Sequence, residues 1–206
     1  MDSKIKDKVK LPWAIRNEVR RVICQPLYWL LFIVKGVKWG RGWRILGAPL
    51  IQRFGGSSIH IGDRVILRSW VSSNPVAPYH PVFLSTRSEE AEITIGDEVG
   101  ITGGSIIAAQ RVEIGNRVLV GGNCLITDSD FHPLDKKERV QEPKKINCRP
   151  VLIGDDVFIG TQSIILKGSS IGTGSIIGAG SVVSGKIPAN VIAAGNPAVV
   201  IRHLDQ

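Results

Sequence analysis

Several residue types that mark common folds and sites are scarce in this 206-residue chain. It has five phenylalanines, two tyrosines, four histidines and one methionine. Its three cysteines, Cys24, Cys124 and Cys148, form no CxxC pair and leave an odd count, which argues against a disulfide framework and a zinc site. The scattered histidines likewise predict no metal site. A reducing compartment, the cytoplasm, is therefore the expected location.

Long apolar runs and a secretory signal are also missing. The longest apolar run of the N-terminal region, Leu27 to Val34, has eight residues, whereas a membrane-spanning helix needs about 20. The run begins far from the N-terminus, and no small-residue cleavage site follows it. The sequence therefore predicts neither a secreted protein nor a membrane-spanning one.

Excess positive charge is absent from most of the chain. Residues 1–44 hold eleven Lys and Arg against three Asp and Glu, a net charge of +8 that equals the formal net charge of the whole chain. The remaining residues are balanced, so the composition gives no support to a nucleic-acid-binding body. No nucleic-acid partner is expected.

Glycine and aliphatic residues are abundant instead, and they follow a repeat of six residues. The chain has 23 glycines, and glycine often follows the aliphatic residue of the repeat, as in Ile153-Gly154. The fourteen aliphatic positions, which fall into several runs of differing phase, are Ile61, Leu67, Ile95, Ile101, Ile107, Ile114, Val120, Ile126, Ile153, Ile159, Ile165, Ile171, Ile177 and Val183.

A period of six fits neither an amphipathic helix nor alternating strands, whose periods are about 3.6 and 2 residues. It is typical of a parallel β-helix of triangular cross-section, in which six residues form one side and one corner, and three such units close a coil. The aliphatic residues are expected to point inward, and glycine allows the corner geometry. The fourteen positions predict an all-β fold of about four to five coils.

The repeat and its flanks resemble a known enzyme family. Residues 153–187, IGDDVFIGTQSIILKGSSIGTGSIIGAGSVVSGKI, are similar to the hexapeptide-repeat left-handed β-helix of the acyltransferase superfamily. The ending AAGNPAVVIRHL, residues 193–204, resembles the exit from this helix in sugar O-acetyltransferases of the galactoside, maltose and nodulation type. Residues 95–135, which end in ITDSDFHPLD, most resemble O-acetyltransferases of surface-polysaccharide synthesis.

The resemblance covers residues 58–204 and implies a left-handed β-helix domain there. It implies an acetyl-CoA-dependent enzyme that acetylates a hydroxyl of a sugar or glycan precursor. It also implies a homotrimer in which two chains share each active site. Two other interpretations stay open: an N-acetyltransferase acting on an amino sugar or small amine, and a non-catalytic β-helix that serves as an assembly scaffold.

The repeat is interrupted by two segments, residues 72–92 and residues 127–150, which are predicted to be loops. Long connections in compact domains are usually functional or disordered. The first loop contains His80, which either lines an acceptor pocket or belongs to a loop that packs on a neighbour. The second loop leaves the β-helix directly after Ile126 and contains the sequence DSDFHPLD.

His132 lies in the second loop, where the resemblance implies the family's catalytic histidine. Histidine ionises near neutral pH, so it can take a proton from a sugar hydroxyl and return it within one turnover. Cys124 occupies a repeat position taken elsewhere by valine or serine and is expected in the core, so direct transfer from acetyl-CoA is favoured over an acyl-enzyme. Asp128 and Asp130 are candidates to orient the ring of His132, and each could instead cap the loop as an Asx turn.

The resemblance also implies a binding site for acetyl-CoA on the glycine-rich C-terminal coils. Thr161, Ala179 and Ser184 are expected along the pantetheine arm. Arg202 is expected near the phosphates of CoA, because a guanidinium suits that charge. The chain departs from the galactoside type at Val199, where that type has a further basic residue.

Residues 1–57 precede the resemblance and are rich in basic and aromatic residues. Pro26 is expected to divide their helix into two pieces. The segment either caps the first coil, as solenoids require, or lies on an anionic membrane surface through residues 1–44. In the second case, a lipid-linked sugar acceptor would be presented at the inner face of the membrane.

Overall fold

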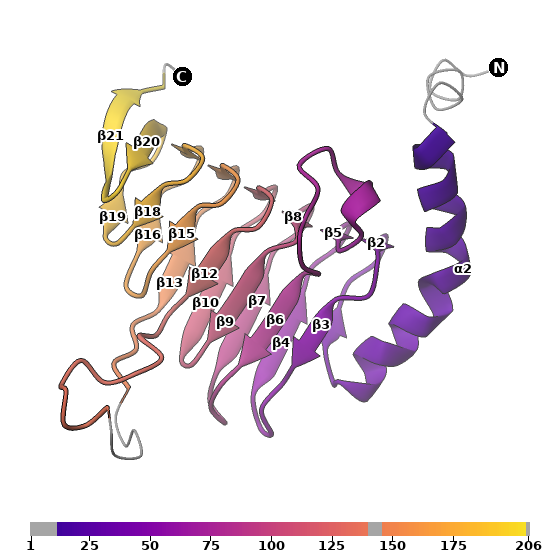
Figure 1. Cartoon of the computed structure of the whole chain (residues 1–206), viewed down its shortest axis with the longest axis horizontal. Helices are drawn as coiled ribbons and strands as arrows, with labels where there is room; N and C mark the ends of the chain where they lie inside the picture. Colours follow the sequence, from indigo (N-terminus) through magenta and orange to yellow (C-terminus); the bar gives the residue numbers. More distant parts are fainter. Residues whose placement is uncertain (1–11, 140–145, 205–206) are drawn as a thin grey trace.

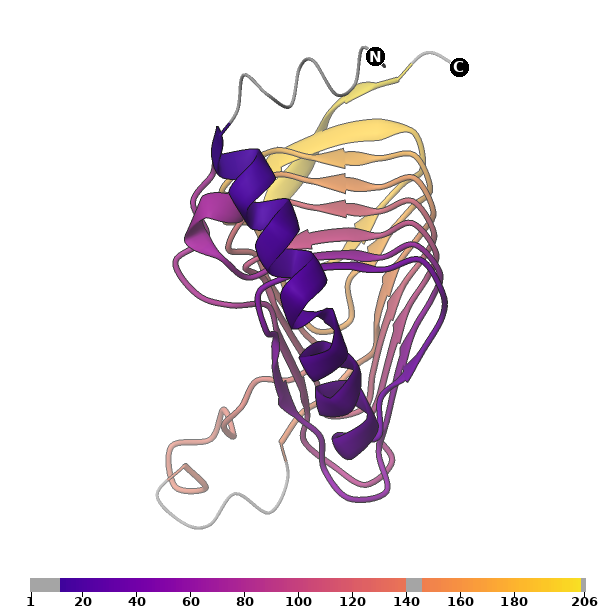
Figure 2. The same cartoon turned by 90° about the vertical axis from the view of Figure 1, so that its right-hand side faces the viewer.

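The computed structural model describes residues 12–139 and 146–204, which form a parallel β-helix with one N-terminal α-helix (Figure 1). Short strands stack into three sheets, A, B and C, which are the faces of a triangular prism (Figure 2). The predicted fold class, a left-handed parallel β-helix, is confirmed.

The strands of each sheet come from successive coils. Sheet A contains, in spatial order, β1 (Lys38–Trp39), β4 (Ser58–Ile61), β7 (Glu92–Ile95), β10 (Arg111–Ile114), β13 (Val151–Ile153), β16 (Ser170–Ile171) and β19 (Lys186–Ile187). Sheet B contains β2 (Arg44–Leu46), β5 (Ile66–Arg68), β8 (Gly100–Thr102), β11 (Leu119–Val120), β14 (Phe158–Ile159), β17 (Ile176–Ile177), β20 (Val191–Gly195) and β21 (Ala198–His203). Sheet C contains β18 (Val182–Val183), β15 (Ile164–Ile165), β12 (Leu125–Thr127), β9 (Ser105–Ala108), β6 (Phe83–Thr86) and β3 (Leu50–Gln52).

The chain passes from sheet A to B to C in each coil, which gives the prism three edges, AB, BC and CA. Six coils are complete, from β1–β3 to β16–β18, and β19 and β20 begin a seventh. The last strand, β21, turns back and pairs with β20 in antiparallel fashion. The prediction of four to five coils was too low, and the sheets begin at Lys38 rather than at residue 58.

The first coil follows the same period of six as the later ones. Its inward positions, each aligned with a residue of the second coil, are Trp39 with Ile61, Ile45 with Leu67, and Ile51 with Leu84. A tryptophan at the first position, in a segment dominated by basic and aromatic residues, concealed this repeat in the sequence.

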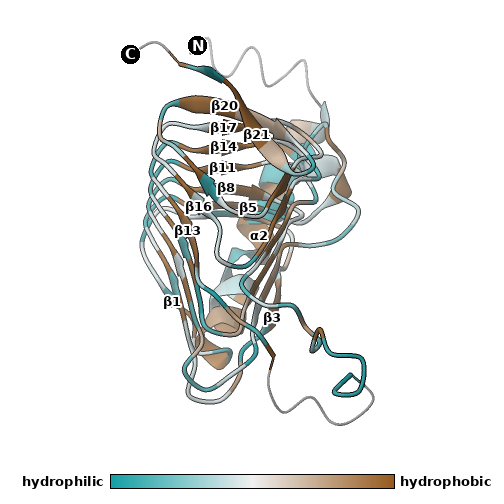
Figure 3. Ribbon diagram, turned by 90° about the vertical axis from the view of Figure 1, so that its left-hand side faces the viewer, coloured by the Kyte–Doolittle hydropathy of each residue, from teal (hydrophilic) through white to brown (hydrophobic). Residues whose placement is uncertain are grey.

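Inward-pointing aliphatic side chains fill the prism, and apolar colour follows the stacked strands (Figure 3). Every predicted inward residue is buried except Ile107. Ile106 takes that position instead, fully buried and aligned with Ile126 of the next coil. The corner at Gly103 is shorter, so the inward position comes five rather than six residues after Ile101.

Side-chain oxygens tie successive coils together along edge AB. The backbone N–H of Asp63 donates to Oδ1 of Asp97 over 2.8 Å. The N–H of Asp97 donates to Asn116 in the same way, and that of Asn116 to Asp155, over 2.9 and 2.8 Å. A Cβ atom on Gly96 would lie 2.6 Å from a carbonyl oxygen of the next coil. The repeated Ile-Gly-Asp/Asn sequence therefore reflects coils that touch at this edge.

Helix α2 (Pro12–Val34) lies across the open end of the first coil (Figure 2). Tyr28 and Phe32 are buried against that coil, and the ring of Phe32 lies 6.0 Å from Trp39 and 5.1 Å from Trp43 between centroids. The N-terminal helix thus caps the solenoid, as one of the two predicted roles requires.

The prediction that Pro26 divides the helix is wrong, because α2 is continuous through it. Proline removes one N–H and leaves the carbonyl of Val22 without a helical donor. Val22 and Pro26 are both exposed, so water can reach this part of the helix and bond to the carbonyl. The ribbon bends partway along, as a proline kink does (Figure 1).

The two interruptions of the repeat are loops, with one change of bounds. Strand β6 lies inside the predicted first loop, so only residues 69–82, including a 3-10 turn at Val71–Ser73, leave the β-helix there. The predicted second loop, residues 127–150, begins with the last residue of β12, and residues 128–150 connect β12 to β13. A bridge between Ser129 and Cys148 closes the base of this loop.

Candidate functional site

A groove of about 480 Å³ runs over sheet B beside edge BC. Strands β8, β11, β14 and β17 form its floor, and the loop 69–82 contributes one side. Its glycines are Gly100, Gly121, Gly122, Gly160 and Gly178. A Cβ atom on Gly160 would lie 2.4 Å from the backbone nitrogen of Ala179, so the coils approach too closely for side chains here. Backbone therefore forms much of this wall.

Two of the predicted donor-binding residues line the groove. Thr161 and Ala179 occupy equivalent corners of successive coils at edge BC. The hydroxyl of Thr161 donates to the carbonyl of Gly122 over 2.6 Å, and Ala179 is exposed.

The floor of the groove carries a row of outward-facing apolar side chains. Leu119, Phe158 and Ile176 are aligned in successive strands of sheet B. Leu119 is 54% exposed and Phe158 is 45% exposed. The groove therefore combines an apolar floor with a corner of backbone groups, which suits an extended ligand that has both aliphatic and amide parts.

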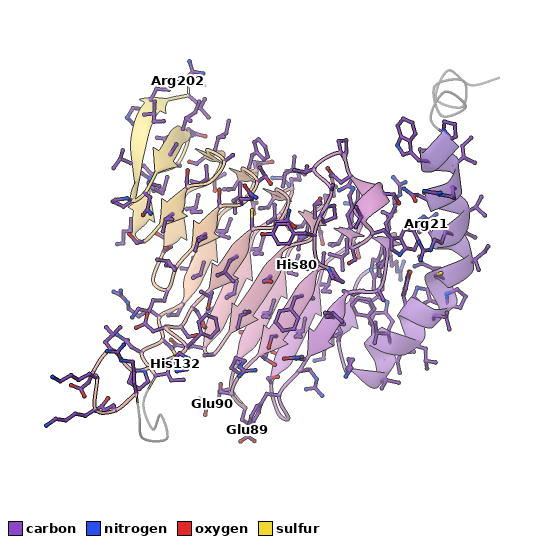
Figure 4. All side chains as sticks on the ribbon, viewed as in Figure 1. Arg21, His80, Glu89, Glu90, His132 and Arg202 are labelled. Carbon is purple, nitrogen blue, oxygen red and sulfur yellow. The ribbon has the colours of Figure 1, made fainter. Side chains whose placement is uncertain are left out.

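The other two predicted donor-binding residues lie elsewhere. Ser184 is an exposed residue on edge CA, between β18 and β19. Arg202 is an exposed residue of β21, at the C-terminal end of the solenoid (Figure 4). Within one chain, the structure does not bring all four residues into one pocket.

His132 is exposed on the loop that leaves edge CA after β12. Figure 4 shows it at the margin of the prism, and it is not among the residues that line the groove on sheet B. Sheet C lies between edge CA and edge BC, so His132 and Thr161 of one chain are one face of the prism apart.

Asp128 anchors the base of this loop. Its fully buried carboxylate accepts hydrogen bonds from the backbone N–H groups of Ala109, Gln110 and Arg111, over 2.6 to 2.7 Å. Burial raises the pKa of Asp128, and the three amide bonds oppose that effect. The side chain predicted to orient His132 therefore holds a corner of the preceding coil.

Asp130 is bound by a cation from a later coil. Its Oδ2 accepts a hydrogen bond from Nζ of Lys167, and both side chains are largely shielded from solvent. This pair fastens the loop to edge CA just before His132. The prediction that Asp128 or Asp130 orients the histidine stays a prediction.

Cys124 is a core residue, as predicted. It is 1% exposed, and its Sγ donates to the carbonyl of Gly160 over 3.2 Å. Burial raises its pKa to about 11, so the thiol remains protonated at neutral pH. Cys124 is therefore unsuited to act as a nucleophile.

The loop 69–82 packs against edge BC beside the groove. Nδ1 of His80 lies 2.7 Å from the carbonyl oxygen of Pro81, and the imidazole meets the ring of Tyr79 edge-on at 5.2 Å. His80 is half-buried and does not line the groove (Figure 4). Its two predicted roles both stay open.

Arg68 and Asn74 also line the groove, and the sequence did not single them out. Arg68 is the last residue of β5, and the repeat signal around it concerns only the inward neighbour Leu67. The signal available in the sequence was a basic residue on the outer face of a strand directly before an extruded loop.

Comparison with known proteins matches residues 150–185 to the family model for the bacterial transferase hexapeptide, six repeats. WcaF of Escherichia coli, which is named for an acetyltransferase role in colanic acid biosynthesis, is 33% identical over 197 residues, which cover 95% of this chain and 87% of WcaF. The galactoside O-acetyltransferase of Escherichia coli is 38% identical over 101 residues, covering 49% of this chain and 50% of that protein.

Among solved structures, the chain resembles AntD, an N-acyltransferase from Bacillus cereus that was determined with dTDP and 3-hydroxybutyryl-CoA. The TM-score is 0.61 at 21% identity, over 82% of this chain and 85% of AntD, which is a likeness of fold. The chain spans 50% to 62% of the length of three of the curated relatives that it matches.

The helix α2 does not qualify as a membrane span, and neither does any other helix in the described residues, 12–139 and 146–204. None of these helices is both long and apolar enough to cross a bilayer.

The buried bonds of Asp128 predict a structural effect of its mutation. Asp128→Asn leaves at least one of the three backbone N–H groups facing an amide NH₂ instead of an acceptor. The expected loss of stability is about 1–3 kcal/mol, measured by thermal or urea unfolding, with faster proteolytic cleavage within the loop 128–150. Asp135→Asn, in an exposed turn of the same loop, is the control and should change stability little. Equal stability of both variants would refute the anchoring role.

Proposed function

The chain belongs to the bacterial hexapeptide-repeat transferases, together with the acetyltransferase that it matches along nearly its whole length, and on this premise we propose that it acetylates a sugar. The reaction moves an acetyl group from acetyl-CoA to a hydroxyl of a sugar or glycan precursor. The groove at edge BC, with Thr161 and Ala179 on its wall, is the observation that carries this proposal.

The groove fits the pantetheine arm of acetyl-CoA in shape and chemistry. Its four floor strands span about 14 Å at the usual spacing between strands. The row of Leu119, Phe158 and Ile176 would contact the aliphatic parts of the arm. The amides of the arm would meet backbone groups at the corner, where glycines allow close approach.

The active site is proposed to form between two chains of a homotrimer. His132 lies at edge CA, whereas Thr161 and Ala179 lie at edge BC of the same chain. In a trimer whose three-fold axis faces sheet C, edge CA of one chain would lie against edge BC of the next. His132 of one subunit would then face the thioester held by its neighbour. Ser184, on edge CA as well, would approach the same arm from the side of His132.

In the proposed reaction, His132 removes the proton from the acceptor hydroxyl, and the oxygen attacks the thioester carbonyl. Backbone N–H groups stabilise the tetrahedral oxyanion. The C–S bond then breaks, and His132 returns the proton to the departing thiolate of CoA. Asp130 is the better candidate to orient His132, because the three amides engage both carboxylate oxygens of Asp128.

A hydroxyl acceptor is supported by the relationship to the galactoside O-acetyltransferase over 101 residues. The similarity to AntD concerns the fold and leaves an amine acceptor as the second candidate. The two products differ in chemistry, because hydroxylamine cleaves an acetyl ester and leaves an acetamide intact.

The exposed face of α2 is proposed to bind an anionic membrane. Its outward residues form an apolar face, and the large hydrophobic side chains exposed on this face are Ile15, Val19, Val22, Ile23, Leu27, Trp29, Leu30, Ile33 and Val34. Such a face on a helix that does not cross the bilayer suits the interfacial region of a membrane.

The basic residues near this apolar face predict that it prefers an anionic membrane surface. Exposed Arg16 on α2, and Lys35, Lys38 and Arg41 just after the helix, accompany the apolar face. Anionic headgroups would attract these cations. In a trimer whose axis is parallel to the solenoids, all three α2 helices face the same side and could contact one membrane together.

Mutation of the proposed base is the first prediction of this function. His132→Ala should lower acetyl transfer by about a hundredfold to ten-thousandfold, while acetyl-CoA binding and the trimer persist. Activity is measured as acceptor-dependent thiol release. His60→Ala, on the outer face of sheet A, is the matched control and should retain activity. Full turnover by His132→Ala would refute the assignment.

Mixed trimers test whether two chains share the site. Ala179→Trp should block the groove, and both it and His132→Ala should be inactive alone. Unfolded together in equal amounts and refolded, they should recover about a quarter of wild-type activity, since that fraction of random interfaces pairs an intact His132 with an intact groove. Mixed trimers without activity would show that each site lies within one chain.

Vesicle sedimentation tests the membrane surface. The protein should bind vesicles of phosphatidylcholine with phosphatidylglycerol, and bind pure phosphatidylcholine more weakly. The double variant Ile23→Gln/Leu30→Gln keeps the charge and should lose most of this binding, whereas Leu134→Gln, an exposed control in the loop 128–150, should not. Undiminished binding by the double variant, or self-association through α2 without vesicle binding, would refute the proposal.

A further inference from the structure

A second pocket, of about 450 Å³, lies beside the groove toward the N-terminal end of the solenoid. The first half of α2, strands β2 and β5 and the loop 69–82 form its walls. The pocket and the groove share Arg68 and Asn74 among their lining residues, so the two spaces adjoin. A molecule in the pocket would therefore lie next to the end of a pantetheine arm bound in the groove.

Arg68 stands between these two spaces. Its side chain is about half buried, and within the described parts of the chain, residues 12–139 and 146–204, no carboxylate forms an ion pair with it. Burial and the nearby Arg44 lower its pKa. Burying a cation without a partner costs free energy, so an anion at this point would stabilise the protein.

The guanidinium of Arg68 reaches over the next coil toward the groove. Its Nη1 lies 3.8 Å from where a Cβ atom on Gly100 would be. Gly100 is aligned with Ile66, two residues before Arg68, so the side chain folds back along sheet B. The absence of a side chain at residue 100 leaves this space to the guanidinium.

The other charged side chain in the lining of this pocket is a cation too. Arg44 lines it and donates to Glu18 over 3.0 Å, but Arg21 binds the same carboxylate. Hydrogen bonds from Arg21 help lower the pKa of Glu18 to about 2, so this carboxylate is ionised at neutral pH. Arg21 and Arg44 therefore share the single negative charge of Glu18, and that charge does not neutralise Arg68.

The walls of the pocket are held in place without a ligand. Asn17 is 4% exposed and donates to the backbone oxygen of Ser72 over 2.7 Å, while the hydroxyl of Ser72 donates back to Asn17 over 2.9 Å. These bonds fix the loop 69–82 to α2. Trp13, 53% exposed, lines the mouth and offers an aromatic face that suits the apolar side of a sugar ring.

Resting on the proposed acetyl transfer, we propose that this pocket binds the acceptor and that the acceptor is an anionic saccharide, whose carboxylate or phosphate pairs with Arg68. The guanidinium fork matches either anion by paired hydrogen bonds. A sugar held there presents its hydroxyls toward the groove, where the thioester would lie. Arg68 is a specificity-determining residue in this scheme and takes no proton.

The test is binding of matched sugars to the trimer, measured by calorimetry. The probes are methyl β-D-glucuronide and glucose 1-phosphate, with methyl β-D-glucoside as the neutral comparison. The carboxylate or the phosphate sugar, or both, should bind about tenfold tighter than the glucoside, as a charge-assisted bond to Arg68 predicts. Arg68→Gln should abolish this preference. Arg87→Gln removes the same charge from an exposed turn at edge CA and should keep it.

Binding of acetyl-CoA to the same samples separates this inference from the proposed function. Acetyl-CoA should still bind Arg68→Gln, because this variant leaves the apolar row of the groove and its corner at Thr161 and Ala179 intact. Wild type that binds acetyl-CoA but binds all three sugars equally, or binds none, would overturn the acceptor inference alone. Weaker binding of acetyl-CoA by Arg68→Gln would assign Arg68 to the donor phosphates and would also overturn it. A charge preference without acetyl-CoA binding would support the anion pocket and contradict the transferase.

Discussion

The close contact between successive coils at their edges is the constraint on which the rest of this structure depends. A Cβ atom on Gly96 or Gly160 would lie within 2.6 Å of backbone in the next coil, so these corners exclude side chains. The parallel strands supply hydrogen bonds, and the buried aliphatic columns supply the apolar contacts. The result is a rigid prism whose outer walls near edge BC are largely backbone. Such a wall can hold an extended ligand, but it has few side chains for chemistry.

Chemistry in this molecule is therefore expected from what leaves the repeat. The loop 128–150 carries His132, and the loop 69–82 closes the space that contains Arg68. Both loops are anchored by buried polar side chains, Asp128 in one case and Asn17 in the other. A helix across the first coil then has two different faces. Its inner face, with Phe32, covers the core, and its outer face exposes apolar side chains, with exposed basic residues on the helix and just after it.

Much of the fold followed from the sequence because a period of six constrains both the strand and the corner. The repeat located the inward column correctly, apart from Ile107, where a shorter corner shifted the register to Ile106. The sequence did not predict the first coil, because Trp39 begins it in a segment dominated by basic and aromatic residues. Continuity of α2 through Pro26 could not be foreseen, since it depends on the solvent exposure of one carbonyl. The role of Asp128 could not be predicted either, because its partners are backbone N–H groups 17 to 19 residues away, and sequence motifs do not record backbone partners.

Binding of acetyl-CoA to the purified, folded protein is the most direct measurement, with free CoA as the comparison ligand. Calorimetry should find about one site per chain for acetyl-CoA, as expected for a symmetric trimer. Ala179→Trp should abolish it, because the substituted side chain fills the groove. No binding to the folded wild-type protein would contradict acetyl transfer and leave the β-helix as an assembly scaffold.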